Sequence, residues 1–294
     1  MQEGRAARCV VIKGIPWWAK LAAKIVLSRL PFDYRRWAAI GLFKHGAMVD
    51  PEYALGVFRS HFDRAEFSAK QRGFTCLELG PGDSLLSAPI ARAFGAQCCY
   101  LVDSEDFASR EMAPLHKLLE LLTVQRKDVS DLRSASGWSD VLSRCNAKYL
   151  VGGAHALSSI PNASVDFVWS QAVLEHIRKR DFVKTMQELR RILRSGGCCS
   201  HTVDLTDHFN GQLNNLRFSA ARWESPLFAD SGFYTNRIRF GEMMAVFESA
   251  GFEVSQIYIR DWEQLPTARR LLDVSFSTLA DKDLLTCGFD VVLR

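Results

Sequence analysis

The sequence Phe74-Thr-Cys-Leu-Glu-Leu-Gly-Pro-Gly-Asp-Ser84 carries the signals from which the fold of this chain follows. Residues 74–79 are a short, mainly apolar run of the kind that forms a buried strand. Gly80 and Gly82 come next, and the apolar residues of 85–94 recur at helical spacing. A strand, a glycine turn and a helix in this order open a binding site at the carboxyl edge of a doubly wound sheet.

The carboxylate in front of the glycines indicates which ligand the turn accepts. A dinucleotide fingerprint needs a third glycine where Leu85 stands, so the turn is not of that type. Its order is Glu-x-Gly-x-Gly, and a carboxylate there suits a cationic ligand better than a pyrophosphate. The next predicted strand, 97–102, ends at Asp103, about twenty residues after the turn, the spacing at which an acidic residue meets ribose hydroxyls.

The most specific motifs lie around the fourth predicted strand, 165–170. They read Ser-Val-Asp-Phe-Val-Trp-Ser-Gln-Ala-Val-Leu-Glu-His over 164–176 and Glu-Leu-Arg-Arg-Ile-Leu-Arg-Ser-Gly-Gly over 188–197. With the glycine turn, they resemble the class I S-adenosylmethionine-dependent methyltransferases over about residues 73–204. Nucleic-acid amino-methyltransferases typically carry Asn/Asp-Pro-Pro-Tyr/Phe where this chain has Ser-Gln-Ala-Val, so no nucleic-acid partner is expected.

The resemblance implies an α/β fold, a Rossmann-like seven-stranded sheet flanked by helices. We expect an N-terminal helical extension over 1–72, a methyltransferase domain over 73–294, and a substrate lid insertion at 205–240, after the fifth strand. S-adenosylmethionine is the expected cofactor. Its expected contacts are Glu78, Gly80, Pro81, Gly82, Asp103, Ser104, Ala154, Ser170 and Gln171. Gly-Gly-Ala-His stands at 152–155, where the family often has an Asp for the adenine amino group, so adenine recognition would rest on backbone groups.

Methyl transfer to a hydroxyl needs a general base near the acceptor proton. His176, just after the fourth strand, and His201 and Asp204, in or after the fifth strand, are the catalytic candidates. A structural hydrogen bond is the alternative role for each histidine. A metal site is the rival use of these side chains together with Glu175 and His208. The similar ubiquinone-biosynthesis O-methyltransferases place an additional Glu where Ala172 stands, so no metal is expected.

The predicted insertion is rich in Asn, Arg, Trp and Tyr, which suit a hydroxyl-rich or anionic ligand on a loop at the carboxyl edge. The expected acceptor contacts are His208, Asn215, Arg217, Tyr234, Asn236 and Arg237. The whole pattern looks like bacterial methyltransferases associated with surface-polysaccharide biosynthesis, which implies O-methylation of a small-molecule or glycan hydroxyl, such as that of a sugar. The alternatives are N-methylation or lipid-head-group methylation, and a non-catalytic cofactor-binding protein that acts in an assembly.

Charge is distributed unevenly along the 294 residues, whose net charge is +4. Residues 1–50 hold nine Lys or Arg against three acidic residues, a net charge of +6. Within them, an apolar stripe with two tryptophans and interspersed lysines runs over 17–26. Such a helix can lie in a membrane interface, and it can equally pack on its own domain.

The remaining composition indicates a cytoplasmic protein, with peripheral contact to the inner membrane through residues 1–50 as an open alternative. None of the eight cysteines forms a C-x-x-C pair, which is typical of reduced thiols used as small core residues. The chain has no apolar span of membrane length and no cleavable signal. A homodimer is left open.

Overall fold

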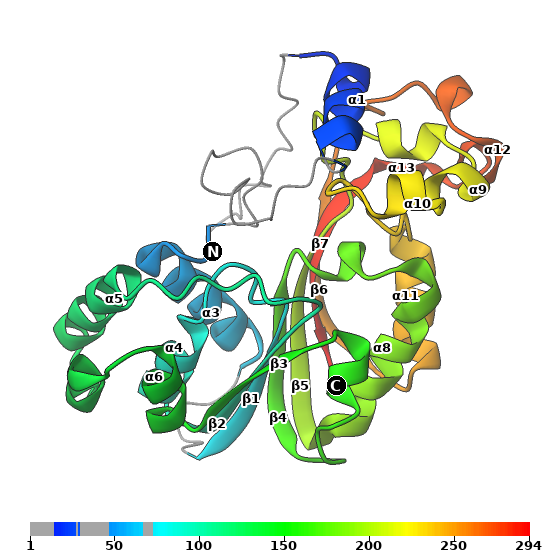
Figure 1. Cartoon of the computed structure of the whole chain (residues 1–294). Coiled ribbons are helices and arrows are strands. Elements are labelled where there is room, and N and C mark those ends of the chain that lie inside the picture. Colours follow the sequence, from blue (N-terminus) through cyan, green and yellow to red (C-terminus); the bar gives the residue numbers. More distant parts are fainter. Residues whose placement is uncertain (1–14, 28, 30–46, 67–72) are drawn as a thin grey trace.

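The computed structural model describes residues 15–27, 29, 47–66 and 73–294. Its centre is a seven-stranded sheet of strand order β3-β2-β1-β4-β5-β7-β6 (Figure 1). The strands are β1 (Phe74–Leu79), β2 (Ala96–Asp103), β3 (Ala147–Val151), β4 (Val165–Gln171), β5 (Leu193–Asp204), β6 (Val254–Asp261) and β7 (Thr286–Leu293). β1 to β5 are parallel, and β7 runs antiparallel between β5 and β6. The predicted seven-stranded Rossmann-like fold is confirmed.

Helices cover both faces of the sheet (Figure 1). One face packs against α3 (Pro51–Arg64), α4 (Ser87–Ala93), α5 (Ala113–Val124) and α6 (Trp138–Arg144). The other packs against α7 (Ala154–Leu157), α8 (Lys179–Ile192) and α11 (Phe240–Ser249). β1 serves both cores because successive side chains point to opposite faces, with Cys76 in the first core and Leu77 in the second.

Helix α3 belongs to the first core although it precedes the sheet in the sequence. Phe58 is completely buried and contacts the Trp169 ring edge-on at 5.2 Å. Phe62 packs against Phe74 and Phe167, at 5.8 and 6.0 Å between ring centroids. The expected boundary at residue 72 therefore does not separate two cores, because α3 packs directly on the sheet.

The insertion at 205–240 forms a third core together with α1 (Trp17–Leu27). It contains η3 (Asn214–Arg217), α9 (Ala220–Trp223) and α10 (Pro226–Ala229). Leu21 of α1 packs among the aromatic side chains of Phe209, Trp223 and Phe233. The inward stripe of α1 therefore packs on its own protein, as one of the two sequence interpretations predicted.

The segment between β6 and β7 completes the molecule beside the insertion. It contains η4 (Arg269–Leu271), α12 (Val274–Ser277) and α13 (Asp281–Leu285), whose apolar side chains pack against Leu213 and Leu216. The two remaining short elements are η1 (Ser130–Ser134) and η2 (Leu174–His176). Within the described ranges, every helix is too short or too polar to span a bilayer.

Candidate functional site

The glycine turn and the end of β2 form one hydrogen-bonded unit at the carboxyl edge of the sheet. The Gly82 N–H donates to Oδ2 of Asp103 at 2.8 Å, and the Ser104 N–H donates to Oδ1 at 2.7 Å. Asp103 is nearly buried, and this burial raises the pKa of its carboxyl group. The sequence placed these residues in one site, and the structure brings them together.

The loop after β3 joins the same unit. The N–H groups of Gly152 and Gly153 donate to the Asp103 carbonyl oxygen at 2.9 and 2.8 Å. A Cβ atom built on Gly153 would lie 3.8 Å from Cα of Ser104, so the loops after β2 and β3 are in close contact. Ala154, the first residue of α7, therefore follows a loop that contacts the end of β2, and its predicted contact with the cofactor stays a prediction.

Gly80 has a structural reason to be glycine that the sequence did not show. Its φ is +74°, in the left-handed region, and a Cβ atom there would lie 2.5 Å from Cγ2 of Val173. The sequence predicts that a ligand lies against the bare backbone of Gly80. In the structure, the position that a Cβ atom would take at this residue is next to Val173. A substitution at this glycine would thus disturb packing whether or not a ligand binds.

Glu78 lies beneath the turn with its side chain buried. One of its carboxylate oxygens has no hydrogen-bond partner among the described residues, and burial raises the pKa of the group to about 8. Pro81, the other predicted contact in this stretch, is also buried.

Ser170 does not face this edge, which contradicts its predicted role. It is completely buried, and its hydroxyl lies 2.7 Å from Nδ1 of His201, on the face of the sheet that carries α8 and α11.

These residues fit S-adenosylmethionine. Each oxygen of the Asp103 carboxylate accepts one N–H and retains a lone pair for a ribose hydroxyl. Glu78 lies beneath the turn as a buried hydrogen-bonding group, and because burial raises its pKa to about 8, its carboxyl group is protonated at neutral pH. Backbone groups at 152–154 lie beside Ser104, where an adenine would have to be recognised without an Asp side chain.

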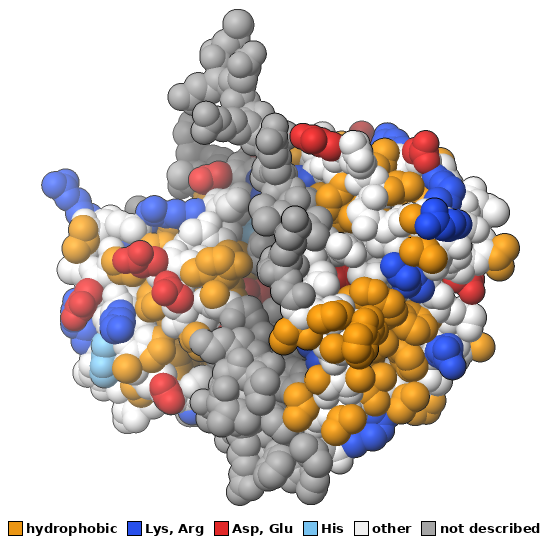
Figure 2. Space-filling view, turned by 90° about the horizontal axis from the view of Figure 1, so that it is seen from above, with side chains coloured by type: hydrophobic (Ala, Val, Ile, Leu, Met, Phe, Trp, Pro, Cys, Tyr) orange, Lys and Arg blue, Asp and Glu red, His pale blue; other side chains and the backbone are white. Residues whose placement is uncertain are grey.

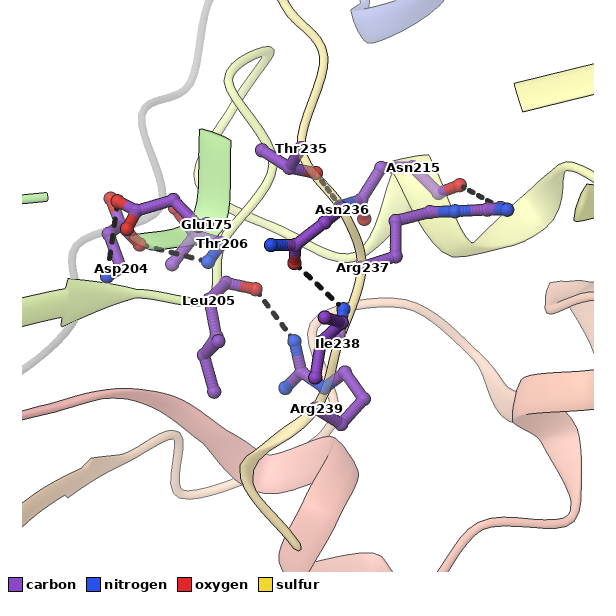
Figure 3. Close-up of a pocket in the computed structure, with 10 residues that line it drawn as sticks. All are labelled: Glu175, Asp204, Leu205, Thr206, Asn215, Thr235, Asn236, Arg237, Ile238 and Arg239. Carbon is purple, nitrogen blue, oxygen red and sulfur yellow. Dashed lines mark hydrogen bonds between the residues drawn. The ribbon is translucent and has the colours of Figure 1, made fainter. Parts of the chain in front are cut away.

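A cavity of about 400 Å³ opens at the carboxyl ends of β4 and β5. Residues of β4 to β7, of the loop after β4 and of the insertion line it, and most of them are polar: Gln171, Ala172, Thr202, Asp204, Thr206, Gly211, Arg260 and Cys287. Figure 3 shows the residues that line a smaller cavity of about 10 Å³. Asp204 and Thr206 line both cavities, so the two are adjacent. The Asp204 carboxylate accepts the Thr206 N–H at 2.9 Å, so it is held in place at the wall of the larger cavity.

The His201 side chain is buried between the sheet and the helices that cover it, and it does not line either cavity. Its side chain is completely buried, Nδ1 lies against the Ser170 hydroxyl, and burial lowers its pKa to about 3. A general base must come within hydrogen-bond reach of the acceptor proton. The predicted catalytic role of His201 is therefore wrong for this geometry.

His176 and His208 form a stacked pair that joins η2 to the insertion. Their ring centroids are 4.7 Å apart, and their Nε2 atoms are 3.1 Å apart. Nδ1 of His176 lies 2.9 Å from the Tyr234 carbonyl oxygen, which can only accept, so Nδ1 carries the proton and Nε2 accepts from His208. Burial and the neighbouring Lys24 lower the pKa of His208 to about 4. Neither histidine is among the residues that line the two cavities.

The predicted acceptor contacts of the insertion are mostly engaged in holding the insertion itself. The Asn236 amide donates to the carbonyl oxygens of Leu174 and Ile177 at 2.8 and 3.0 Å. The Arg237 guanidinium donates to the Phe218 carbonyl oxygen at 2.6 Å. The same guanidinium lies between the rings of Trp223 and Phe276, about 5 Å from each ring centroid. The structure thus contradicts acceptor binding by Asn236 and Arg237, which are buried and already paired.

The other three predicted contacts of this group have similar structural roles. The Asn215 amide donates to the Thr235 hydroxyl at 3.0 Å, and the Tyr234 hydroxyl donates to the Glu224 carboxylate at 3.0 Å. The Arg217 guanidinium lies over the Trp17 ring of α1 at 5.0 Å. Asn215 and Arg237 line only the smaller cavity.

Sequence reasoning missed a buried histidine that orients a residue of the large cavity. Nε2 of His61, on α3, lies 3.0 Å from Oε1 of Gln171, and Nδ1 lies 2.9 Å from the Ser200 hydroxyl. Because the Gln171 oxygen accepts from His61, its NH₂ group points elsewhere and can serve the cavity that Gln171 lines. The only available signal was His61 on the apolar side of a helix outside the motifs.

A metal site was the rival interpretation of the acidic and histidine side chains. Among the residues that the structure describes, no group of three or more His, Cys, Asp or Glu could hold a metal ion.

The sheet order, the glycine turn and the acidic end of β2 agree with the Rossmann-like, S-adenosylmethionine-dependent methyltransferase that the sequence predicts. Residues 77–200 match a family described as a methyltransferase domain. The matched segment begins in β1 and ends in β5, so it contains the glycine turn, the loops after β2 and β3, and Gln171. No curated protein sequence matches the chain.

Solved structures with a similar arrangement include several methyltransferases. The S-adenosylmethionine-dependent methyltransferase from Mesorhizobium loti has 14% identity over 76% of this chain and 91% of that chain, with a TM-score of 0.42. One from Methanosarcina mazei has 15% identity over 76% of this chain and 92% of that chain, with a TM-score of 0.42. Phosphoethanolamine N-methyltransferase 2 of Haemonchus contortus has 15% identity over 80% of this chain and 52% of that chain, with a TM-score of 0.43. At these values, none of them bears on the acceptor of this chain.

Proposed function

We propose that the chain transfers a methyl group from S-adenosylmethionine to a hydroxyl of a small molecule or glycan, such as a sugar. The observation that supports this acceptor is the cavity of about 400 Å³ at the carboxyl ends of β4 and β5. Its lining offers the hydroxyls of Thr202 and Thr206, the Gln171 amide, the Arg260 guanidinium and the Asp204 carboxylate. Arg260 is already paired with the Asp290 carboxylate at 3.1 Å, and a ligand with many hydroxyl groups can form hydrogen bonds with the remaining hydroxyl, amide and carboxylate groups.

Asp204 is the side chain best placed to act as the base. Bound S-adenosylmethionine supplies a methyl group on a sulfonium, and the acceptor oxygen must approach it in line. Asp204 lines the cavity, and the Thr206 N–H fixes one carboxylate oxygen at 2.9 Å. The carboxylate would accept the hydroxyl proton as the oxygen attacks. The His176–His208 pair has a structural role, because it holds the insertion against η2. Apart from the base, alignment of the acceptor with the methyl group contributes much of the rate.

An amine acceptor is the second candidate, and one feature favours it. The cavity wall carries a carboxylate, and buried Glu175 lies beside it, with its Oε1 accepting the Asp204 N–H at 3.3 Å. The Asp204 carboxylate at the cavity wall attracts a protonated amine, as in N-methylation of a lipid head group, whereas burial and the neighbouring Asp204 raise the pKa of Glu175 well above its usual range. A non-catalytic assembly role would require cofactor binding without turnover.

The cytoplasmic location of the protein and its assembly into a homodimer stay predictions.

The test measures release of S-adenosylhomocysteine by the purified full chain with two acceptor panels, nucleotide sugars and glycosides in one, ethanolamine-type amines in the other. We expect turnover with the first panel. Asp204→Asn should lower kcat by roughly 10²–10⁴-fold and leave cofactor affinity nearly unchanged. Asp261→Asn, at the exposed end of β6, is the matched control.

Each alternative has its own result. Turnover with amines alone would refute O-methylation, and cofactor binding without turnover on either panel would favour the assembly role. If Asp204→Asn retains full kcat, Asp204 is not the base.

A further inference from the structure

The helix α1 has a second apolar side that the packing on the insertion does not use. The inward side, through Leu21, is buried in the third core. On the outward side, the exposed fractions of the Ile15, Trp18 and Val26 side chains are 62%, 61% and 61%. Leu227 of α10, exposed by 45%, lies next to this side, because Arg29 donates to its carbonyl oxygen at 3.2 Å. These four side chains, Ile15, Trp18, Val26 and Leu227, are called the apolar patch below.

Figure 2 shows this surface from above, where hydrophobic side chains gather on the half of the molecule that carries α1 and the insertion. Lys and Arg side chains lie to the right of and below the hydrophobic area in this view, and a few Asp and Glu side chains lie farther out on the same half. An exposed group of large apolar side chains of this kind usually marks an interaction surface.

The charges around the apolar patch have one sign along α1. The described residues 15–29 contain Lys20, Lys24 and Arg29 and no Asp or Glu. They belong to the first 50 residues, which carry the net charge of +6. Lys20 and Lys24 face the insertion, so Arg29 is the cation of this segment that lies beside the apolar patch. A helix that carries a tryptophan and aliphatic side chains on one side and belongs to a basic segment is complementary to an anionic lipid surface.

The position of α1 connects the apolar patch to the acceptor cavity. Nζ of Lys20 donates to the Phe209 carbonyl oxygen and to Oδ1 of Asn210, both at 2.6 Å. Gly211, the next residue, lines the large cavity. The helix is thus fixed to the segment that forms one wall of that cavity.

We propose that the apolar patch docks the protein on an anionic membrane surface, where the acceptor is presented by a membrane-bound carrier. The second half of this inference rests on the proposed function. Trp18 would lie at the level of the lipid head groups, Val26 and Leu227 at the acyl boundary, and Arg29 among the anionic head groups. The contact is reversible, because a single short helix buries little apolar area in the bilayer.

Co-sedimentation of the full chain with vesicles tests the docking without any acceptor. We expect binding to vesicles of phosphatidylcholine mixed with phosphatidylglycerol, weaker binding in high salt, and little binding to phosphatidylcholine alone. The double substitution Trp18→Ser with Val26→Ser should weaken binding by roughly tenfold or more. Val124→Ser, at the end of α5, removes an equally apolar side chain that is 84% exposed and should have no effect.

Turnover of a soluble acceptor by the same variants separates this inference from the proposed function. If wild-type protein does not bind anionic vesicles, or if both variants bind like wild type, the inference is wrong even where turnover is normal. If the wild type is a dimer that does not bind vesicles, and the double variant is a monomer in sedimentation equilibrium, the apolar patch is an interface between two copies. Vesicle binding with no turnover on any acceptor would refute only the proposed function.

Discussion

At the scale of single residues, the position of the carboxylate at the end of β2 was predicted correctly, whereas the role of the histidine inside β5 was not, although the pattern of the strand indicates its burial. Asp103 was found by its distance from the glycine turn, and it lies at that turn. Along β5, however, His201 has the same parity as Cys199 and Val203, which face the second core. Period-2 alternation therefore indicates that His201 is buried with them, and chemical suitability alone misassigned it. The role of His61 depends on a contact with Gln171, 110 residues away, that no local pattern encodes.

Asp103 is the better residue with which to test the cofactor site. A substitution at Gly80 would clash with Val173, so a loss of binding there would not identify a ligand contact. Asp103→Asn keeps the size of the side chain but replaces one accepting oxygen by an NH₂ group that faces a backbone N–H. Loss of hydrogen bonds to a charged group should weaken binding of S-adenosylhomocysteine by roughly 10–100-fold. Calorimetry measures it.

The control for this substitution is Asp106→Asn, three residues further on. Asp106 is exposed and pairs with Arg110 at 2.8 Å, so its replacement should leave cofactor affinity unchanged. Equal affinities for wild type and Asp103→Asn would show that the end of β2 does not hold the cofactor.

At the scale of elements, the motifs located the strands and their loops correctly, while the elements outside the motifs were harder to interpret. The insertion was expected to present polar side chains to an acceptor. Instead, Asn236 and Arg237 satisfy carbonyl groups of irregular backbone, which cannot pair with itself as a helix or strand does. Composition alone does not distinguish these two uses of polar residues in a long loop.

Asn236 should therefore contribute to stability rather than to acceptor binding. Asn236→Ala removes two donated hydrogen bonds and leaves the carbonyl oxygens of Leu174 and Ile177 and the Ile238 N–H without this partner. We expect the free energy of unfolding to fall by roughly 2–4 kcal/mol, because these groups are buried. Chemical denaturation measures the loss. Asn162→Ala, an exposed site that accepts one bond from Arg191, should cost far less, and equal losses for the two variants would contradict the assignment.

At the scale of the whole molecule, burial of titratable groups on both faces of the sheet sets the pH range of stability. His61 and His201 are completely buried, and burial lowers their pKa values to about 4 and about 3, from an ordinary value of 6.5. The unfolded chain binds protons at these groups more readily than the folded chain. Their contribution is therefore fully present above pH 6.5 and is lost as the pH falls toward 4 and 3.

Glu78 has the opposite effect, and it should define the alkaline side of the stability curve. Burial raises its pKa from 4.5 to about 8, so the folded chain binds the proton more tightly, and stability is lost as the pH rises from 4.5 to 8. Between pH 6.5 and 8 the two histidines no longer titrate in either state, and Glu78 acts there without them. Glu78→Gln should make the decline over this range shallower, where one proton corresponds to about 1.4 kcal/mol per pH unit. A residual decline comes from Glu175, whose pKa is also raised by burial. His201→Asn, which keeps a polar group near Ser170, should flatten only the loss below pH 6.5. Chemical denaturation of both variants from pH 4 to 8 measures the acid and the alkaline side of the stability curve separately. If the stability of Glu78→Gln falls above pH 6.5 as steeply as that of the wild type, the Glu78 carboxyl group is ionised in the folded protein.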